Sequence, residues 1–186
     1  MLSYLALLQK WNKAYNLTAV RNPEDMVIRH LLDSLVVSEH LQGQRIIDVG
    51  TGAGLPGIPL AIIHPDRDFH LLDSNGKKTR FLFQVKTELG LANITAHHAR
   101  VESFRPDSLF DAVLSRAFSS LQDMVTGCQH LLAPQGCYLA MKGVISEQEL
   151  QGVATVCEVA KVEELAVPGL TEQRHLIKLI HRSADE

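Results

Sequence analysis

The sequence feature that most constrains the fold is a short apolar run that ends in closely spaced glycines. Residues 45–57 read R-I-I-D-V-G-T-G-A-G-L-P-G. The first five of these residues are typical of a buried parallel strand, and the apolar stretch over 58–63 that follows the glycines is typical of a helix. A glycine turn between a strand and a helix lets backbone N–H groups approach a ligand closely. The sequence therefore predicts a site for a nucleotide-type ligand here.

Two ligand classes fit the glycine spacing. Gly52, Gly54 and Gly57 satisfy G-x-G-x-x-G, the dinucleotide pattern in which a helix N-terminus holds a pyrophosphate. Gly50, Gly52 and Gly54 satisfy G-x-G-x-G, which resembles the first motif of class I S-adenosylmethionine methyltransferases. Asp48 favours the second class, because a carboxylate before the turn repels a pyrophosphate and attracts a cation such as a sulfonium. A structural glycine turn without a ligand is the simpler alternative.

Length and composition indicate one globular domain. The 186 residues are enough for a single domain, 1–186, which we divide into an N-terminal cap (1–44) and a core (45–186). No apolar run approaches the roughly 20 residues needed to span a bilayer, and no signal peptide is recognisable, so we expect a cytoplasmic protein without membrane contact. The cysteines are odd in number and widely spaced, which predicts buried thiols. The histidines lack metal-ligand spacing, so we expect no metal.

The charge of the chain is unevenly distributed. The net charge is −3, and residues 143–186 carry four Lys or Arg against eight Asp or Glu. A contact with nucleic acid would therefore depend on local clusters such as Lys77, Lys78 and Arg80. For these three residues taken alone, a solvated helix face is the simpler interpretation.

The first 44 residues predict two helices. Apolar residues from Tyr4 to Tyr15 recur at helical spacing. A second helix is predicted from Pro23 to Leu41, with Asn22 as its N-cap and Gly43 as its stop. No strand precedes residue 45, so these helices form a cap on the core.

Residues 45–186 alternate between strand and helix patterns. Beyond the first strand, strands are predicted over 68–73, 93–97, 110–115, 137–141, 158–167 and 174–180, the last two antiparallel at the sheet edge. Helical spacing covers 75–89, 121–132 and 146–152, and a turn is predicted over 134–136. This order predicts an α/β fold with a doubly wound, mostly parallel sheet, of the Rossmann-like type that class I methyltransferases use.

In such sheets the ligand crevice lies at the carboxyl ends of the strands, where the strand order reverses. Gly50, Asp73 and the pair Ser115–Arg116 should therefore converge. Asp73 lies 23 residues beyond Gly50, the position from which a carboxylate reaches ribose hydroxyls. Val101 and Glu102 follow the third strand and are candidates for the adenine edge.

The predicted fourth strand, F-D-A-V-L-S-R-A-F, lacks the motifs of two kinds of methyltransferase, which excludes two classes of methyl acceptor. It lacks the D-P-P-Y or N-P-P-Y motif of enzymes that methylate exocyclic amines, and it lacks the cysteine nucleophile of cytosine C5 enzymes. Arg116 stands at its end. An arginine here could bond to O6 and N7 of a guanine, bind a phosphate, or pair with Asp48 or Glu102, and pairing is the interpretation we favour.

Several longer motifs resemble one family. They are W-N-K-A-Y-N-L-T (11–18), H-L-L-D-S (30–34), D-V-G-T-G-A-G-L-P-G-I-P (48–59), L-L-D-S (71–74), S-R-A-F (115–118), M-K-G (141–143) and E-Q-R-H-L (172–176). Together they resemble the bacterial small-subunit (16S) ribosomal RNA guanine-N7 methyltransferases, also called glucose-inhibited division protein B. The resemblance covers essentially the whole chain, although members of the family usually carry about twenty more residues before the first helix. Part of the cap, and with it some RNA contact, would then be missing.

The resemblance implies a cofactor, a substrate and site residues. It implies S-adenosylmethionine as cofactor and small-subunit ribosomal RNA, in the 30S subunit or an assembly intermediate, as partner. We separately expect the enzyme to be a monomer. Cofactor contacts would fall on Gly50, Leu55, Val101, Glu102 and Arg116, with Asp73 at the ribose, beside Asp48, Gly52 and Gly54 from the loop pattern. RNA or site-wall roles would fall on Lys142 and Arg174.

The implied chemistry needs no catalytic acid or base. Guanine N7 has a free lone pair and no proton, so positioning supplies the rate, and Arg116 is the candidate for positioning the guanine. The alternatives are a nicotinamide-dependent oxidoreductase and a non-catalytic RNA- or ribosome-binding module.

Overall fold

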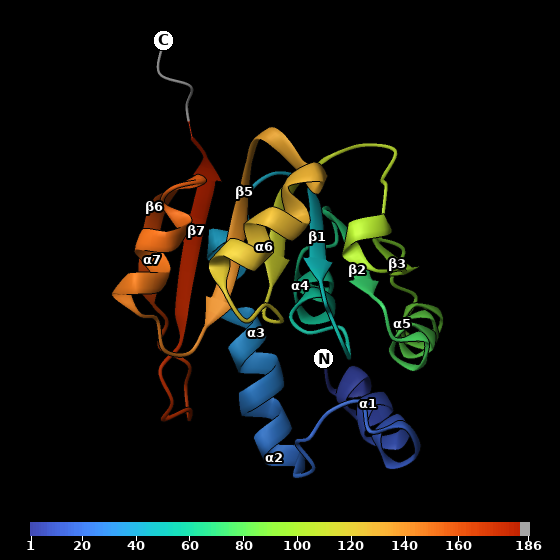
Figure 1. Cartoon of the computed structure of the whole chain (residues 1–186). Helices are drawn as coiled ribbons and strands as arrows, with labels where there is room; N and C mark the ends of the chain where they lie inside the picture. The colour runs from blue at the N-terminus through green and yellow to red at the C-terminus, as the bar shows by residue number, and fades with distance from the viewer. Residues whose placement is uncertain (183–186) are drawn as a thin grey trace.

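A seven-stranded sheet forms the centre of the molecule. The computed structural model describes residues 1–182. The strands are β1 (Arg45–Val49), β2 (Asp68–Asp73), β3 (Ile94–His98), β4 (Phe110–Ser115), β5 (Leu132–Lys142), β6 (Cys157–Glu164) and β7 (His175–His181). Their order across the sheet is β3-β2-β1-β4-β5-β7-β6, with β7 antiparallel to both neighbours and the other pairs parallel (Figure 1). The predicted doubly wound sheet and its antiparallel edge are confirmed.

Helices cover both faces of the sheet. The helical segments are α1 (Leu2–Tyr15), α2 (Pro23–Met26), η1 (Val27–Leu32), α3 (Asp33–Leu35), η2 (Ser38–His40), α4 (Gly57–Ile63), α5 (Gly76–Leu89), η3 (Val101–Ser103), α6 (Leu121–Cys128), η4 (Gln129–Leu131) and α7 (Glu147–Val153). Buried side chains of α1, α4 and α5 share one apolar cluster with one face of the sheet, and those of α6 share a second cluster with the other face. The central strands β1 and β4 are therefore buried on both sides, as their apolar residues require.

The N-terminal cap packs against the core through aromatic side chains. Tyr4 is fully buried, and its hydroxyl donates a hydrogen bond of 2.7 Å to the carbonyl of Ala53 in the glycine loop. The Trp11 ring lies 5.7 Å from the Phe81 ring of α5. The cap thus fixes the loop that follows β1, and in Figure 1 its helices lie below the sheet.

The second predicted helix is irregular. Asn22 caps it as expected, since its side chain accepts hydrogen bonds from the N–H groups of Glu24 and Asp25. The expected continuous helix over 23–41 is wrong, because η1 is a π-helical turn and η2 a 3₁₀ turn. Such π turns are rare and often lie at functional sites.

The predicted turn over 134–136 is also wrong, because these residues belong to β5. The pairing of β4 with β5 shifts register between Phe110 and Ala112, which is where a strand tolerates a proline such as Pro134. The three cysteines are free and buried, as predicted. Within residues 1–182, no helix has both the length and the apolar character to cross a membrane.

Candidate active site

The glycine loop after β1 lies at the centre of the candidate site. Gly50, Gly52 and Gly54 all have positive φ angles, which favour glycine. The Gly50 N–H donates to the carbonyl of Leu72 at 2.8 Å, and the Ser115 hydroxyl donates to the carbonyl of Val49 at 2.7 Å. These bonds join the ends of β1, β2 and β4, so the predicted convergence at the carboxyl ends is confirmed.

Asp48 supports this loop from behind. Its side chain is fully buried, and one carboxylate oxygen accepts hydrogen bonds from the Thr51 hydroxyl at 2.7 Å and from the Gly57 N–H at 2.9 Å. Burial raises the pKa of the Asp48 carboxyl to about 6. Its hydrogen bonds lie inside the loop, it lines none of the cavities described below, and among residues 1–182 its other carboxylate oxygen has no hydrogen-bond partner. A contact of Asp48 with a cationic ligand stays a prediction.

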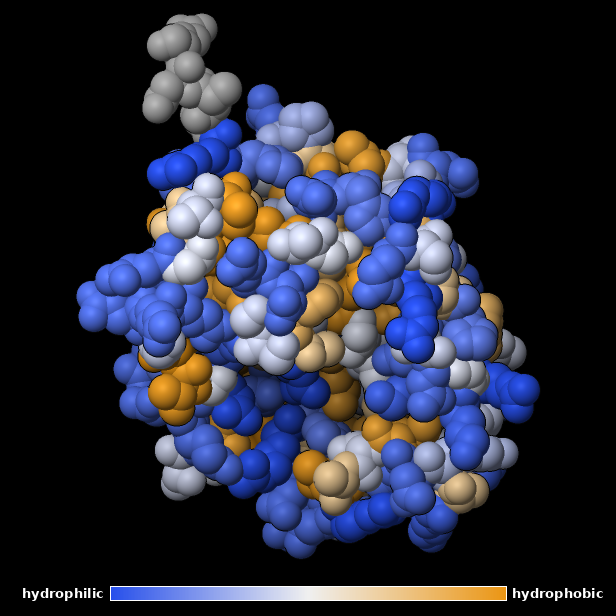
Figure 2. Space-filling view, in the orientation of Figure 1, coloured by the Kyte–Doolittle hydropathy of each residue, from blue (hydrophilic) through white to orange (hydrophobic). Residues whose placement is uncertain are grey.

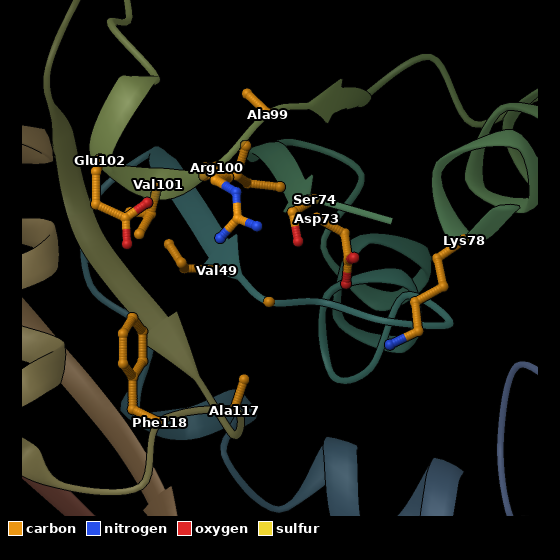
Figure 3. Close-up of a pocket in the computed structure, with 12 residues that line it drawn as sticks. Val49, Asp73, Ser74, Lys78, Ala99, Arg100, Val101, Glu102, Ala117 and Phe118 are labelled. Carbon is orange, nitrogen blue, oxygen red and sulfur yellow. The ribbon is translucent and has the colours of Figure 1, made fainter. Parts of the chain in front are cut away.

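A first cavity, the strand-end cavity, opens beside the loop and has a volume of about 310 Å³. Its lining residues are Val49, Gly50, Leu72, Asp73, Ser74, Lys78, Ala99, Arg100, Val101, Glu102, Ala117 and Phe118. Figure 3 shows Glu102, Val101 and Phe118 on one side and Asp73 and Lys78 on the other. The predicted Asp73, Val101 and Glu102 are thus brought together from the ends of β2 and β3.

Asp73 is fixed by the backbone around it. One carboxylate oxygen accepts from the Gly52 N–H at 2.8 Å, and the other accepts from the Asn75 N–H at 2.8 Å. A carboxylate has about four lone-pair sites, so acceptor capacity is left on both oxygens for ligand hydroxyls. Asn75 caps the helix that follows, since its side chain accepts hydrogen bonds from the backbone N–H groups of Lys77 and Lys78 at the start of α5.

A second cavity, the arginine cavity, lies between η1 and the ends of β5 and β7. Its lining residues are Val20, Arg29, His30, Asp33, Arg116, Met141, Lys142, Gly143 and Arg174, and its volume is about 330 Å³. The space-filling view shows a hollow below the carboxyl ends of the central strands where strongly hydrophilic residues gather (Figure 2). Four basic side chains thus line one cavity in a chain whose net charge is −3.

Arg116 pairs with a residue that sequence reasoning missed. Its Nη1 donates to Oδ2 of Asp33 at 2.8 Å, so the expected pairing with Asp48 or Glu102 is wrong. Arg174 donates from Nε to the other oxygen of Asp33 at 2.8 Å. Asp33 lies 83 residues before Arg116, and the only signal for it was its place in the H-L-L-D-S motif.

Lys142 is held by the protein itself. Its ammonium lies 2.9 Å from a carboxylate oxygen of Glu149 and donates to the carbonyls of Ser119 at 2.7 Å and Phe118 at 3.3 Å. A lysine has three N–H donors, so these contacts use all of them. Lys142 therefore ties the end of β5 to the segment after β4.

A third cavity, the bridging cavity, joins the other two. It is lined by Leu17, Thr18, His30, Gly50, Thr51, Gly52, Ala53, Leu55, Arg116 and Ala117. It shares Gly50 and Ala117 with the strand-end cavity and shares His30 and Arg116 with the arginine cavity. The three cavities therefore adjoin one another along the glycine loop, with Arg116 in the wall that the bridging cavity and the arginine cavity share, and we call this row of cavities the crevice.

His30 was also missed and lies in this crevice. Its Nε2 is 2.9 Å from the Thr18 hydroxyl, and its Nδ1 is buried without a hydrogen-bond partner among the described residues. Burial lowers the pKa of His30, which favours a neutral ring at pH 7.

The other predicted residues lie outside the crevice. Gly54 packs against Ile58, and a Cβ on Gly54 would lie 2.2 Å from the Ile58 side chain. Lys77 and Arg80 are exposed on α5 and line none of the three cavities, whereas Lys78 between them lines the strand-end cavity.

Comparisons with known proteins agree with this architecture. The model of the family described as rRNA small subunit methyltransferase G matches residues 1–177. The chain is 57% identical to the ribosomal RNA small subunit methyltransferase G of Shewanella baltica over 180 residues, which are 97% of this chain and 87% of that protein. The Shewanella oneidensis protein of the same name is 56% identical over the same share of each chain.

Solved structures with low sequence identity share the fold. An S-adenosylmethionine-dependent methyltransferase from Aquifex aeolicus matches with a TM-score of 0.67 at 16% identity, over 96% of this chain and 97% of that chain. TrmK from M. capricolum, solved in complex with S-adenosylhomocysteine, matches with a TM-score of 0.62 at 15% identity, over 82% of this chain and 70% of that chain. With the predicted class I fold confirmed and the family model matching nearly the whole chain, this protein belongs to the rRNA small subunit methyltransferase G family.

Proposed function

We propose that this protein transfers a methyl group from S-adenosylmethionine to N7 of a guanine in small-subunit ribosomal RNA. Membership of the family supports methyl transfer to ribosomal RNA, and the resemblance of the sequence motifs to guanine-N7 methyltransferases suggests guanine as the acceptor. The structural observation that carries the proposal is the row of adjoining cavities with two unlike ends. The strand-end cavity is lined by two carboxylates and apolar groups, and also by Lys78 and Arg100. The arginine cavity is lined by three arginines and Lys142 around the buried Asp33, and the glycine loop separates the two ends.

The strand-end cavity fits the cofactor. Asp73 offers free acceptor capacity for ribose hydroxyls, and Val101 with Phe118 offers apolar walls for a flat base. Gly50, Gly52 and Leu55 line the passage toward the acceptor. When bound, the cofactor supplies an electrophilic methyl group.

The protein's part in the reaction is to position the acceptor. Because N7 carries a free lone pair and no proton, no side chain has to remove one. The tight loop bonds of Asp48, Asp73 and Ser115 keep the floor of the crevice in place without reorganisation during the reaction. We therefore assign no general acid or base.

The basic end of the crevice fits the RNA. N7 lies in the deep major groove of A-form RNA, where protein side chains cannot reach it, so the target guanine should be unstacked. Arg174, Arg116 and Arg29 surround the space that such a nucleotide would enter. Lys77 and Arg80 are left as outer contacts, and Lys142 shapes the wall.

We further propose that residues 1–186 act as one domain, as a monomer in the cytoplasm, where ribosomal RNA is modified. Exposed large apolar side chains, such as Phe83 on α5 and Val162 on β6, come from different elements. Size-exclusion chromatography with light scattering tests the oligomeric state.

The deciding experiment is mass spectrometry of ribosomal RNA from cells with and without this protein. We expect one N7-methylguanosine of the small-subunit RNA to disappear in the strain that lacks it and to return with the wild-type gene. An unchanged N7-methylguanosine inventory would contradict the proposal. Calorimetry provides the cofactor test, since binding of NAD without binding of S-adenosylhomocysteine would favour an oxidoreductase.

A further inference from the structure

A buried carboxylate orients two arginines in the arginine cavity. The Asp33 side chain is 4% exposed, and each of its oxygens accepts a hydrogen bond of 2.8 Å, one from Arg116 and one from Arg174. The three residues come from the cap, from the end of β4 and from the segment before β7. Asp33 thus joins three distant parts of the chain at one point.

The arginines keep donors for a ligand. Their side chains are 27% and 23% exposed, and one carboxylate does not balance two guanidinium groups. Within residues 1–182, Arg116 donates only to Asp33, and Arg174 donates only to Asp33 and to the carbonyl of Gln173. A guanidinium has five N–H donors, so several on each arginine stay available to an anion.

The chemistry of the proposed reaction indicates which anion. An arginine that donates to O6 and N7 of a guanine would occupy the lone pair that must receive the methyl group. The guanine-reading role considered for Arg116 therefore conflicts with methylation at N7. A phosphate oxygen is the acceptor that suits oriented guanidinium groups and leaves N7 free.

We propose that Arg174, held by Asp33, binds a phosphate of the RNA strand beside the target guanine, and that Asp33 is the positioning residue that keeps Arg174 and Arg116 directed into the cavity. The inference rests on the proposed function. The inference adds a subsite for the RNA backbone to that function. It also places the entry of the nucleotide between the cap and β7.

The variant Asp33→Asn separates positioning from charge. It keeps the shape of the side chain and makes the cavity more positive, so a role through charge alone predicts tighter RNA binding. If Asp33 instead acts by positioning the two arginines, the KM for small-subunit RNA should rise about tenfold. The dissociation constant of S-adenosylhomocysteine should change less than about threefold. Tighter or unchanged RNA binding by the folded variant would overturn the role of Asp33.

Variants of Arg174 test the phosphate contact without touching the buried carboxylate. We expect Arg174→Lys, which keeps the charge but loses the planar fork, to weaken RNA binding about fivefold. We expect Arg174→Gln to weaken it about thirtyfold and to reduce the slope of log affinity against log salt by about one. Urea unfolding of each variant shows that it is folded.

The matched control is Lys161→Gln on β6, because Lys161 is 57% exposed and pairs with Glu163 away from the crevice. It should leave RNA affinity and salt slope unchanged. Wild-type affinity and slope in folded Arg174→Gln, or losses in Lys161→Gln equal to those in Arg174→Gln, would overturn the subsite. Failure of the wild-type protein to bind S-adenosylhomocysteine or to methylate the RNA would instead overturn the proposed function.

Discussion

The strand-end cavity and the arginine cavity differ in how their polar side chains are brought together. In the first, Asp73 ends β2, Glu102 lies in the short η3 turn after β3, and backbone N–H groups of the neighbouring segments fix Asp73. In the second, Asp33, Arg116 and Arg174 come from the cap, from β4 and from the approach to β7. The sheet and the segments that follow its strands form the strand-end cavity. The arginine cavity forms only when the cap packs against the core and brings Asp33 to the two arginines.

The largest effect is expected from Asp73→Ala. Loss of the carboxylate removes the proposed ribose acceptor and also releases the Gly52 N–H, so S-adenosylhomocysteine should bind at least about 100-fold more weakly. RNA affinity should stay within about threefold of wild type. Isothermal calorimetry and filter binding measure the two. The exposed Asp66→Ala is the matched control, and an equal loss of cofactor binding in both variants would refute the assignment.

Arg116→Ala tests the junction between the two ends. The variant removes one of the two partners of Asp33, so kcat/KM for RNA should fall about thirtyfold. The dissociation constant of S-adenosylhomocysteine should change less than about fivefold. The charge control is Lys10→Ala on the exposed side of α1. A cofactor loss larger than the RNA loss would place Arg116 at the strand-end side.

Gly57→Ala tests the support of the glycine loop. A Cβ here would lie 2.3 Å from a methyl of Leu71 and 2.9 Å from the Asp48 oxygen that accepts from the Gly57 N–H. We expect a loss of about 1–3 kcal/mol in the free energy of unfolding, measured with urea. Gly152→Ala in α7 is the control, since only a side-chain atom at 4.0 Å lies near it and helix propensity favours alanine. Equal stabilities of the two variants would contradict the packing argument.

The smallest effect is expected from a pair of histidines on the neighbouring strands β2 and β3. His97 on β3 lies 2.8 Å from His70 on β2, and burial, together with the neighbouring His70, lowers the pKa of His97 from 6.5 to about 4. The folded state therefore favours neutral His97. The contribution of neutral His97 to the free energy of unfolding is complete above pH 6.5. It is lost as the pH falls toward 4, because the unfolded state takes up the proton first.

The raised pKa of Asp48 changes the stability with pH in the opposite direction. This effect is present in both wild type and His97→Gln, so the difference between them reports on His97 alone. The difference in unfolding free energy should change by roughly 1 kcal/mol per pH unit across that range. Urea titrations between pH 4 and pH 8 measure it. A difference that is independent of pH would show that His97 titrates alike in both states.

The two cavities also differ in how well the sequence predicts them. Gly50 and Asp73 could be placed because each follows a recognisable strand, and parallel strands bring their carboxyl ends to one edge. The partner of Arg116 could not, because the contact with Asp33 joins segments 83 residues apart and depends on an irregular π turn. The hydrogen bonds of Asp48 to the loop could not be predicted for another reason, since a strand position alone does not say whether a carboxylate faces the ligand or the loop.

The most direct test of the two-ended crevice measures the affinities for S-adenosylhomocysteine and for small-subunit ribosomal RNA in Asp73→Ala and Arg174→Gln side by side. We expect a crossed pattern in which Asp73→Ala weakens cofactor binding and keeps RNA binding, while Arg174→Gln weakens RNA binding and keeps cofactor binding. If both folded variants lost the same ligand, or if the pattern were reversed, the assignment of the two ends would be contradicted.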